Sequence, residues 1–516
     1  MKRNSIFFFL FLTFNLWAQP EIDWGPFQWN PHRKSSHVWV TTEDSNTVYL
    51  IKRKYGFKAK LMWYIDAIDK KTKALTYSKR IVEPLGQHKS FTKINTIISL
   101  GSKLYLFTSA YEESTGVLSS YATAINKSNG INGGTTLVYS AVVKTANDPD
   151  FNYVTTPDAN ELLICCTPFN MEENEMKLID ENLNTVWKGK IKIKSDKKIL
   201  KKYNLTIDQS ENIIIYSNEI NSITIFSPNK EQLKTIKVVV PDQTVIYNSL
   251  LRVKETNTVY FVALLKTNQY QVTMGLITAT LDCMNQKVLE SETAILDSTQ
   301  FREITGINRG WKEEIGLFYI QDVFFRANKD VTIIAEQKGA QLSSFPNGLY
   351  DNYYPRHMSL YTALQSGYMY VGSYYYTAPV LEYTANLISV FNLSFSGNLQ
   401  WIKIIPKNQI FPASEYLSYI ATFDNEKIYL IYNDNPSNIN AVLPFGPRKL
   451  TNPKRAVGVL STIDNSGKII NEPFYYRKWN DKLMLKPGTS IATGSNKILL
   501  LAERKKIFRL GEITLH

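Results

Sequence analysis

The chain has few of the residues and none of the short motifs from which most catalytic and metal sites are built. Its 516 residues include three cysteines and five histidines. No His-Glu-x-x-His or Gly-x-Ser-x-Gly sequence occurs, and segment 488–495 lacks the spacing and the lysine of a phosphate-binding loop. His32 and His37 flank a basic segment, and we do not expect them to bind a metal. The sequence therefore predicts no catalytic residue, no metal site and no cofactor.

The three cysteines are too few for a disulfide framework. Cys165 and Cys166 are adjacent, and Cys283 stands alone. Neighbours in a strand point to opposite faces, so at least one of the pair belongs in the core. We expect all three to be buried thiols, with a bridge from Cys283 to one of the pair as the alternative.

Long apolar runs are missing after the first eighteen residues, which argues against a transmembrane helix. Those eighteen residues combine Lys2 and Arg3 with an apolar stretch at 6–14 and end in Ala18, a pattern typical of an export signal. We expect cleavage there and a location in the periplasm or at the outer membrane, with the extracellular space as the alternative. Removing two basic residues lowers the formal charge from +13 to +11.

The positive charge is spread along the mature chain, with one dense run at 188–202. Its alternating lysines 188, 190, 192 and 194 fall on one face of a strand. This pattern predicts a solvated strand edge protected against aggregation, with an anion-binding stripe as the alternative. Because the protein is expected to be exported, we expect no nucleic-acid partner.

What the sequence does contain is one turn repeated many times. An apolar residue meets Asp, Asn or Ser at a short polar turn, and a second apolar run follows. The first five copies lie 47 to 57 residues apart. The seven pairs are Ile68-Asp69, Ile125-Asn126, Ile179-Asp180, Phe226-Ser227, Leu281-Asp282, Phe395-Ser396 and Ile463-Asp464.

Ahead of most copies lies a second apolar strand, so the repeating unit has four strands. Amphipathic helix patterns are missing. Four antiparallel strands at this period indicate an all-β protein, a β-propeller of eight blades, with seven as the alternative. The segments 496–501 and 506–515 leave the last blade one strand short. A strand from 22–40 is expected to complete it and close the ring.

The long gap between the fifth and sixth turns predicts an insertion within one blade. Residues 319–337 and 386–404 supply the four strands, and about 338–384 lies between them; a ninth blade is the alternative. The insertion is rich in tyrosine, which is common in recognition surfaces, although packing against the propeller rim explains the cluster equally well. The candidate binding residues are Tyr353, Tyr354, Tyr361, Tyr368, Tyr370, Tyr374, Tyr375 and Tyr376.

Two further patterns are interpreted as structural. Trp187 and Trp401 follow the repeated turn as in quinone-dehydrogenase-like propeller repeats, which predicts that they pack blade against blade. Asn433, Asp434 and Asn435 read as a polar turn, with a Ca²⁺ site as the alternative.

Three segments between residues 300 and 470 resemble a known family. They are Ala335-Glu336-Gln337 followed by the tyrosine-rich stretch, residues 402–407 (IKIIPK) and residues 428–435 (IYLIYNDN). Together they resemble the secreted β-propeller proteins of Bacteroidota with WD40-like or PQQ-like repeats, whose functions are mostly uncharacterised. The resemblance implies an exported propeller in the periplasm or at the outer membrane and brings no catalytic residues.

We therefore expect a non-catalytic scaffold that binds a protein of an outer-membrane or envelope complex, such as one for secretion or nutrient uptake, or a glycan. The alternative is a secreted polysaccharide-active enzyme with its site in the propeller channel. A secreted effector or adhesin is a third hypothesis.

Overall fold

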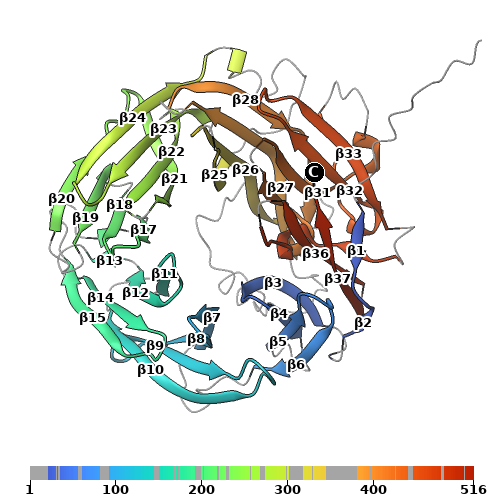
Figure 1. Ribbon diagram of the computed structural model, residues 1–516, viewed down its shortest axis with the longest axis horizontal. Coiled ribbons are helices and arrows are strands. Elements are labelled where there is room, and N and C mark those ends of the chain that lie inside the picture. The colour runs from blue at the N-terminus through green and yellow to red at the C-terminus, as the bar shows by residue number, and fades with distance from the viewer. Residues whose placement is uncertain are drawn as a thin grey trace, which may run out of the picture.

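The computed structural model closes the chain into a ring of eight blades, each a four-stranded antiparallel unit (Figure 1). The eight-bladed prediction is confirmed and the seven-bladed alternative is wrong. The structure describes residues 21–515 except 31, 33–34, 56–60, 82–91, 144–149, 168, 171–173, 192–198, 201–202, 218–219, 228–231, 256, 268–272, 298, 301–317, 328, 344–379, 395–396, 425, 440–445, 478–481, 495 and 505.

The first four blades follow one another along the chain, each running from the inner to the outer strand. A small pair, β13 (Phe169–Asn170) and β16 (Ile199–Leu200), lies beside blade 3. The strands are β3 (Ser35–Glu43), β4 (Thr47–Tyr55), β5 (Leu61–Asp69) and β6 (Leu75–Arg80) in blade 1; β7 (Thr92–Leu100), β8 (Lys103–Glu112), β9 (Val117–Ile125) and β10 (Asn132–Val142) in blade 2; β11 (Asp150–Thr155), β12 (Glu161–Thr167), β14 (Asn174–Asp180) and β15 (Thr185–Ile191) in blade 3; and β17 (Tyr203–Ile207), β18 (Ile213–Ser217), β19 (Ser222–Phe226) and β20 (Gln232–Lys237) in blade 4.

Blades 5 to 7 repeat this order, and blade 8 begins with two short inner strands. The strands are β21 (Thr244–Glu255), β22 (Thr258–Thr267), β23 (Thr273–Asp282) and β24 (Lys287–Ile295) in blade 5; β25 (Phe318–Phe325), β26 (Val331–Ser343), β27 (Val380–Leu393) and β28 (Leu399–Ile405) in blade 6, with β29 (Gln409–Phe411) beside β27; β30 (Tyr419–Phe423), β31 (Ile428–Asp434), β32 (Val457–Ile463) and β33 (Ile469–Tyr476) in blade 7; and β34 (Met484–Leu485), β35 (Ile491–Ala492), β36 (Lys497–Arg504) and β37 (Ile507–Thr514) in blade 8.

Each blade buries both of its faces, which explains why its second strand reads as an unbroken apolar run. In β22, Val259 and Phe261 pack in the cluster shared with blade 4, whereas Tyr260 and Val262 pack in the cluster shared with blade 6. Successive strand residues point to opposite faces, so a strand covered on both sides needs apolar residues at every position. Among the described residues the core forms eight apolar clusters, one between each pair of neighbouring blades.

The repeated turns connect the third and fourth strands of their blades, as the four-strand unit predicts. The polar residue accepts hydrogen bonds from backbone N–H groups two to four positions later: Asp180 Oδ1 from Asn182 and Asn184, at 2.8 Å each, and Asp464 Oδ1 from Ser466 and Lys468, at 2.9 Å each. This turn chemistry explains the preference for Asp and Asn. Phe395 and Ser396 lie outside the described residues.

The N-terminal segment closes the ring, as predicted. Strands β1 (Ile22–Trp24) and β2 (Gln28–Trp29) pair antiparallel with β37 and form the outer edge of blade 8 (Figure 1). The backbone N–H of Asn30 donates to the Lys506 carbonyl at 2.7 Å. Blade 8 is thus built from both ends of the described chain.

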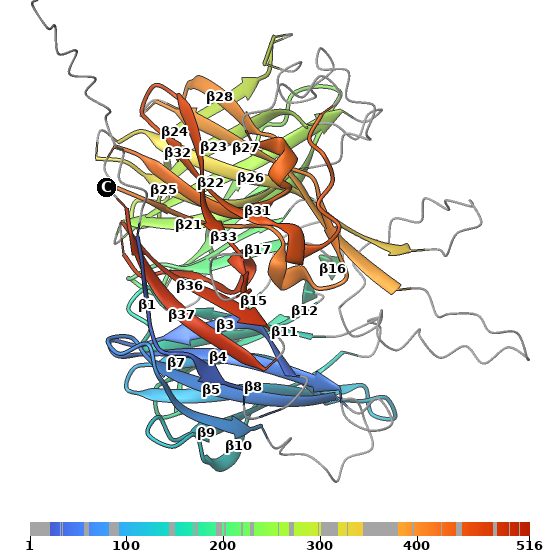
Figure 2. The ribbon, with the colours of Figure 1, turned by 90° about the vertical axis from the view of Figure 1, so that its right-hand side faces the viewer.

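Blade 6 carries an arm. Strands β26 and β27 pair past the level at which β28 ends, from Lys338 opposite Ala385 to Ser343 opposite Val380. Figure 2 shows both strands running out beyond their neighbours. We call residues 338–343 and 380–385 the arm. It leads into residues 344–379, which lie outside the described residues together with the ninth-blade alternative and all eight candidate tyrosines.

Several smaller predictions are confirmed. Cys165, Cys166 and Cys283 are buried free thiols, so the disulfide alternative is wrong. Cys165 and Cys166 belong to different inter-blade clusters. Lys188 and Lys190 lie exposed on β15, the outer edge strand of blade 3, and Lys188 pairs with Glu175 at 2.9 Å. Lys192 and Lys194 lie outside the described residues.

Both tryptophans pack between blades as predicted. Trp187 of blade 3 packs against a cluster that contains Ile213 of blade 4. Trp401 of blade 6 donates from Nε1 to the Asn465 carbonyl of blade 7 at 3.1 Å.

Candidate functional site: buried charges along blades 6, 7, 8 and 1

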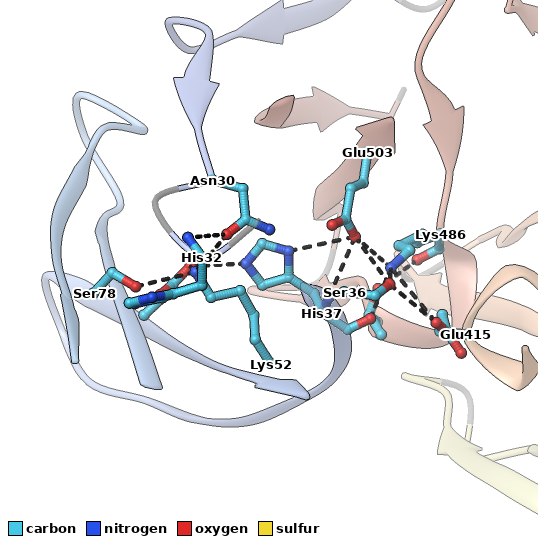
Figure 3. A network of polar contacts seen from close by, with 11 residues as sticks. Asn30, His32, Ser36, His37, Lys52, Ser78, Glu415, Lys486 and Glu503 are labelled. Carbon is cyan, nitrogen blue, oxygen red and sulfur yellow. Dashed lines mark hydrogen bonds and ion pairs between the residues drawn. The ribbon is translucent and has the colours of Figure 1, made fainter. Parts of the chain in front are cut away.

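The structure brings together charged side chains that the sequence analysis did not predict to lie near one another. They form two groups among the described residues. The closure cluster joins blades 7, 8 and 1 and contains Lys52, Asp66, His37, Glu503, Lys486 and Glu415 (Figure 3). The arm-base cluster lies where the arm leaves blade 6 and contains Glu336, Lys338, Lys407, Gln409 and Ser418.

In blade 1, His37 and Lys52 both contact the carboxylate of Asp66. His37 Nε2 lies 2.9 Å from Asp66 Oδ2, and Lys52 Nζ lies 2.6 Å from the same oxygen. All three side chains are fully buried. Lys52 Nζ also donates to Asn30 Oδ1 at 3.3 Å and to Ser78 Oγ at 3.0 Å. The end of the closing strand β2 is therefore tied to blade 1 through Asn30 and Lys52.

In blade 8, Glu503 and Lys486 continue the cluster. Glu503 pairs with Lys486 and accepts from the backbone N–H of His37 at 3.3 Å. The other imidazole nitrogen, His37 Nδ1, lies 3.5 Å from Glu503 Oε2. Lys486 Nζ also donates to the His37 carbonyl and to Ser36 Oγ, each at 2.7 Å, and lies 3.7 Å from Glu415. Figure 3 shows His37 between its blade 1 and blade 8 partners.

Electrostatics keep these buried carboxylates ionised. Burial by itself would raise the pKa of Glu503, but Lys486 and His37 outweigh it and hold that pKa at about 2. Burial likewise opposes charge on Asp66, yet its bonds to His37 and Lys52 lower its pKa below the usual value. Lys52 and Lys486 thus provide the counter-charges for Asp66 and Glu503 inside the ring wall.

The arm-base cluster is centred on an ion pair between Glu336 of β26 and Lys407, with both side chains fully buried at a separation of 2.6 Å. Lys407 Nζ also donates to the Ala385 carbonyl of β27 at 2.9 Å, so one lysine holds both arm strands. Lys338 Nζ lies 3.0 Å from Glu336, and Ser418 Oγ donates to Glu336. Burial is outweighed by the two lysines, so the pKa of Glu336 is lowered.

Asp322 lies beside this cluster on the inner strand β25 and is half-buried. It accepts from the Tyr419 hydroxyl of blade 7 at 2.9 Å. Burial raises its pKa, and the Tyr419 hydrogen bond offsets this only in part. A β-bulge between Ile320 and Asp322 bends this strand and changes the direction of its side chains there.

Side-chain amides link inner strands elsewhere in the ring. Asn95 Nδ2 donates to Asp150 Oδ1 at 2.7 Å between blades 2 and 3. Asn204 Nδ2 donates to the Ser249 carbonyl at 2.9 Å between blades 4 and 5. Amide donors therefore join these blades, whereas ion pairs join blades 6, 7, 8 and 1.

A cavity of about 370 Å³ opens beside the inner strands of blades 1 to 3. Its lining is neutral, with hydroxyl and amide groups and no carboxylate or histidine. The lining residues are Thr42, Thr96, Ile97, Ile98, Ser99, Phe151, Asn152, Tyr153, Thr155 and Ala159.

The predicted polar turn at 433–435 is placed differently. Asn433 and Asp434 end strand β31, and Asn435 caps the following 3-10 helix η4 (Pro436–Asn438). Asn433 Nδ2 donates to the Tyr416 and Leu485 carbonyls at 2.8 and 3.0 Å. The described residues contain no group of three or more His, Cys, Asp or Glu side chains arranged to hold a metal ion.

Sequence reasoning missed these clusters, although a signal was present. Asp66 interrupts the apolar run of β5, Lys52 follows the run Val-Tyr-Leu-Ile, and Glu336 and Glu503 follow the runs Ile-Ile-Ala and Leu-Leu-Ala. A charge inside a strand buried on both faces requires a partner.

Within the described part of the chain, no helix is both long and apolar enough to cross a bilayer.

No protein-family model matches the chain, and no curated protein matches it. Among solved structures it is similar to the β-propeller domain of the Trilobed protease from Pyrococcus furiosus, at 10% identity and a TM-score of 0.37, over 86% of this chain and 97% of that one. A protein of unknown function from Bacteroides caccae is 8% identical at a TM-score of 0.28, over 72% and 94%. A catalytically inactive virginiamycin B lyase from Staphylococcus aureus is 9% identical at a TM-score of 0.35, over 96% and 100%. At these scores the likenesses carry no argument about function.

Proposed function

We propose that this protein is an exported, non-catalytic propeller that binds a protein of the cell envelope through residues 344–379. The observation that carries the proposal is the arm. Six residue pairs, from Lys338–Ala385 to Ser343–Val380, extend β26 and β27 past the end of β28 as far as the residues that flank this segment. A paired arm with a buried ion pair at its base fixes where a recognition segment is presented. This arrangement fits an accessory subunit of an outer-membrane secretion or uptake complex.

The composition of the segment supports a contact role. It contains all eight candidate tyrosines, from Tyr353 to Tyr376. Tyrosine provides a large, rigid contact area at low conformational entropy cost, with a hydroxyl for hydrogen bonding. Stacked aromatic rings also suit sugars, so a glycan is the second outcome that the test below distinguishes.

The buried carboxylates support binding over acid–base chemistry. Asp66, Glu336 and Glu503 are each paired with a lysine or histidine inside the protein. A general acid or base must reach the reacting group on a substrate, and these groups are enclosed between blades.

One observation favours the second candidate, a polysaccharide-active enzyme. Asp322 is half-buried on an inner strand and its pKa is raised by burial, as for a general acid. In that case Asp322→Asn would abolish activity on a glycan panel, while Asp322→Glu would retain part of it.

The binding proposal is tested by shortening the arm. Ser343 and Val380 are directly paired, so an Asn-Gly turn replacing residues 344–379 closes the hairpin without disturbing the blade. A second variant keeps the segment and changes only the eight candidate tyrosines to serine. Both variants and the wild type are tagged, expressed in the native host and purified after chemical cross-linking of the cell envelope.

The proposal predicts one stoichiometric envelope protein with the wild type and its loss with both variants. Retention of the partner by both variants would contradict it. A wild type that recovers no protein but binds a glycan array through the same tyrosines would replace the protein partner with a glycan.

A further inference from the structure

The arm and the ring closure are joined by one short connection between blades 6 and 7. Residues 407–419 begin at the arm base with Lys407 and β29, and end at Ser418 and Tyr419. Between them, the 3-10 helix η3 (Ser414–Tyr416) supplies Glu415 to the closure cluster. The same thirteen-residue stretch therefore contacts both clusters.

At its start the connection is bonded tightly to the arm. Strand β29 pairs with β27 from Tyr383 opposite Phe411 to Ala385 opposite Gln409, so it forms a third strand at the arm base. Gln409 Oε1 accepts from Lys407 Nζ at 3.0 Å and from the Ser418 N–H at 2.8 Å. Through Ser418, the end of the connection also reaches Glu336.

At its centre the connection holds blade 8. The Tyr416 ring lies beneath Lys486 Nζ, 4.8 Å from its centroid, and Ser36 Oγ donates to Glu415 at 3.2 Å. Asn433 bridges the two sides, because its amide donates to the carbonyls of Tyr416 and Leu485, the residue before Lys486. Gln409 Nε2 in turn donates to the Asn433 carbonyl.

We propose that residues 407–419 couple the arm to the N-terminal strand, so that a change at the arm base alters the stability of the ring closure. The described contacts run without a break from Lys338 through Glu336, Lys407, Gln409 and Asn433 to Tyr416 and Lys486. They continue through Glu503, His37, Asp66 and Lys52 to Asn30. Almost every side chain along this route is buried. Binding of a partner to the arm therefore changes the stability with which β1 and β2 pair with β37.

Coupling through packed side chains requires direct evidence, because spatial continuity alone does not establish it. The test is hydrogen exchange measured by mass spectrometry on the full chain carrying Lys407→Met. Arg326→Met is the matched control. Arg326 is also a buried cation between blades 6 and 7, bonded to Thr332 and Asn465, but it has no contact with either cluster.

The proposal predicts that Lys407→Met accelerates exchange in β1 and β2 at least tenfold, whereas Arg326→Met leaves these strands unchanged. Because Lys407→Met leaves Glu336 buried without its partner, the double variant Glu336→Gln/Lys407→Met is measured as well. It removes both charges and still interrupts the route, so the same loss of protection is expected.

Coupling is reciprocal, so Lys52→Met is expected to accelerate exchange in β29. Equal exchange in β1 and β2 for the wild type, Lys407→Met and the double variant would overturn the proposal. So would equal effects of Lys407→Met and Arg326→Met, which would show a general loss of stability.

Discussion

The imidazole of His37 meets the carboxylate of Asp66 at 2.9 Å, and both side chains are fully buried. His37 belongs to the inner strand of blade 1 and also faces Glu503 of blade 8. The contact is thus part of the closure cluster, which lies where the two ends of the ring meet. Lys52 and Glu503 offer the first two tests of this arrangement.

Lys52→Met is expected to destabilise the protein by about 3–5 kcal/mol, because removing one partner leaves Asp66 buried without its counter-ion. The measurement is the free energy of unfolding in urea. Lys188→Met is the control, since Lys188 forms an exposed pair with Glu175, and exposed pairs contribute less than about 1 kcal/mol. Equal effects of the two variants on the free energy of unfolding would show that the closure cluster does not stabilise the fold.

Glu503 is expected to make stability depend on acid pH. Its pKa of about 2 in the folded protein lies below the usual 4.5. Its ionised form therefore stabilises the fold fully above pH 4.5, by about 3 kcal/mol, and this contribution is lost as the pH falls through about 2. The difference in unfolding free energy between the wild type and Glu503→Gln should shrink accordingly between pH 5 and pH 2.

Glu512→Gln, which removes an exposed pair with Lys497 on the neighbouring strand, provides the comparison. A pH-independent difference for Glu503→Gln would contradict the assignment.

Asp434 is expected to have the opposite pH dependence. Burial raises its pKa to about 6, above the usual 3.8. The folded state therefore favours the protonated form, and stability falls as the pH rises through 6, by at most about 3 kcal/mol. Asp434→Asn should be more stable than the wild type at pH 8 and nearly equal at pH 4, because an amide oxygen accepts the same bonds from Asn435 and Asn438.

Asp464→Asn is the control for Asp434, since turn hydrogen bonds, chiefly from Ser466, lower the pKa of Asp464. It should gain no stability at high pH. Thermal melts at pH 4 and 8 decide between these outcomes.

The three cysteines are expected to remain unreactive in the native protein. All are buried, and burial raises the pKa of Cys283 to about 12, so the reactive thiolate is scarce. A thiol reagent such as DTNB should detect no fast-reacting group before unfolding and three groups afterwards. Rapid reaction of any thiol in buffer would contradict the burial of the cysteines.

The blade pattern was readable from the sequence because its cause is local. A strand covered on both faces needs an unbroken apolar run, as in β22, and a tight turn needs Asp or Asn, as at Asp180 and Asp464. The missing strand of blade 8 was also predictable, because an open edge must be paired.

The buried charges were not predicted because their partners are far apart in the sequence. His37 and Glu503 are separated by 466 positions, and Ser36 and Lys486 by 450. A charge beside an apolar run indicates burial and the need for a partner, but it does not identify that partner. Only the closed ring places Lys52, Asp66 and Glu503 around one histidine.

The central claim is that the segment at the end of the arm contacts an envelope protein. The most direct measurement places a photo-cross-linking amino acid at Tyr361 or Tyr374, and for comparison at Val186, which is exposed on the outer strand of blade 3. After illumination of intact cells, the account predicts one cross-linked envelope protein from each tyrosine position and none from Val186. Cross-links of equal yield from all three positions, or none from the tyrosine positions, would contradict it.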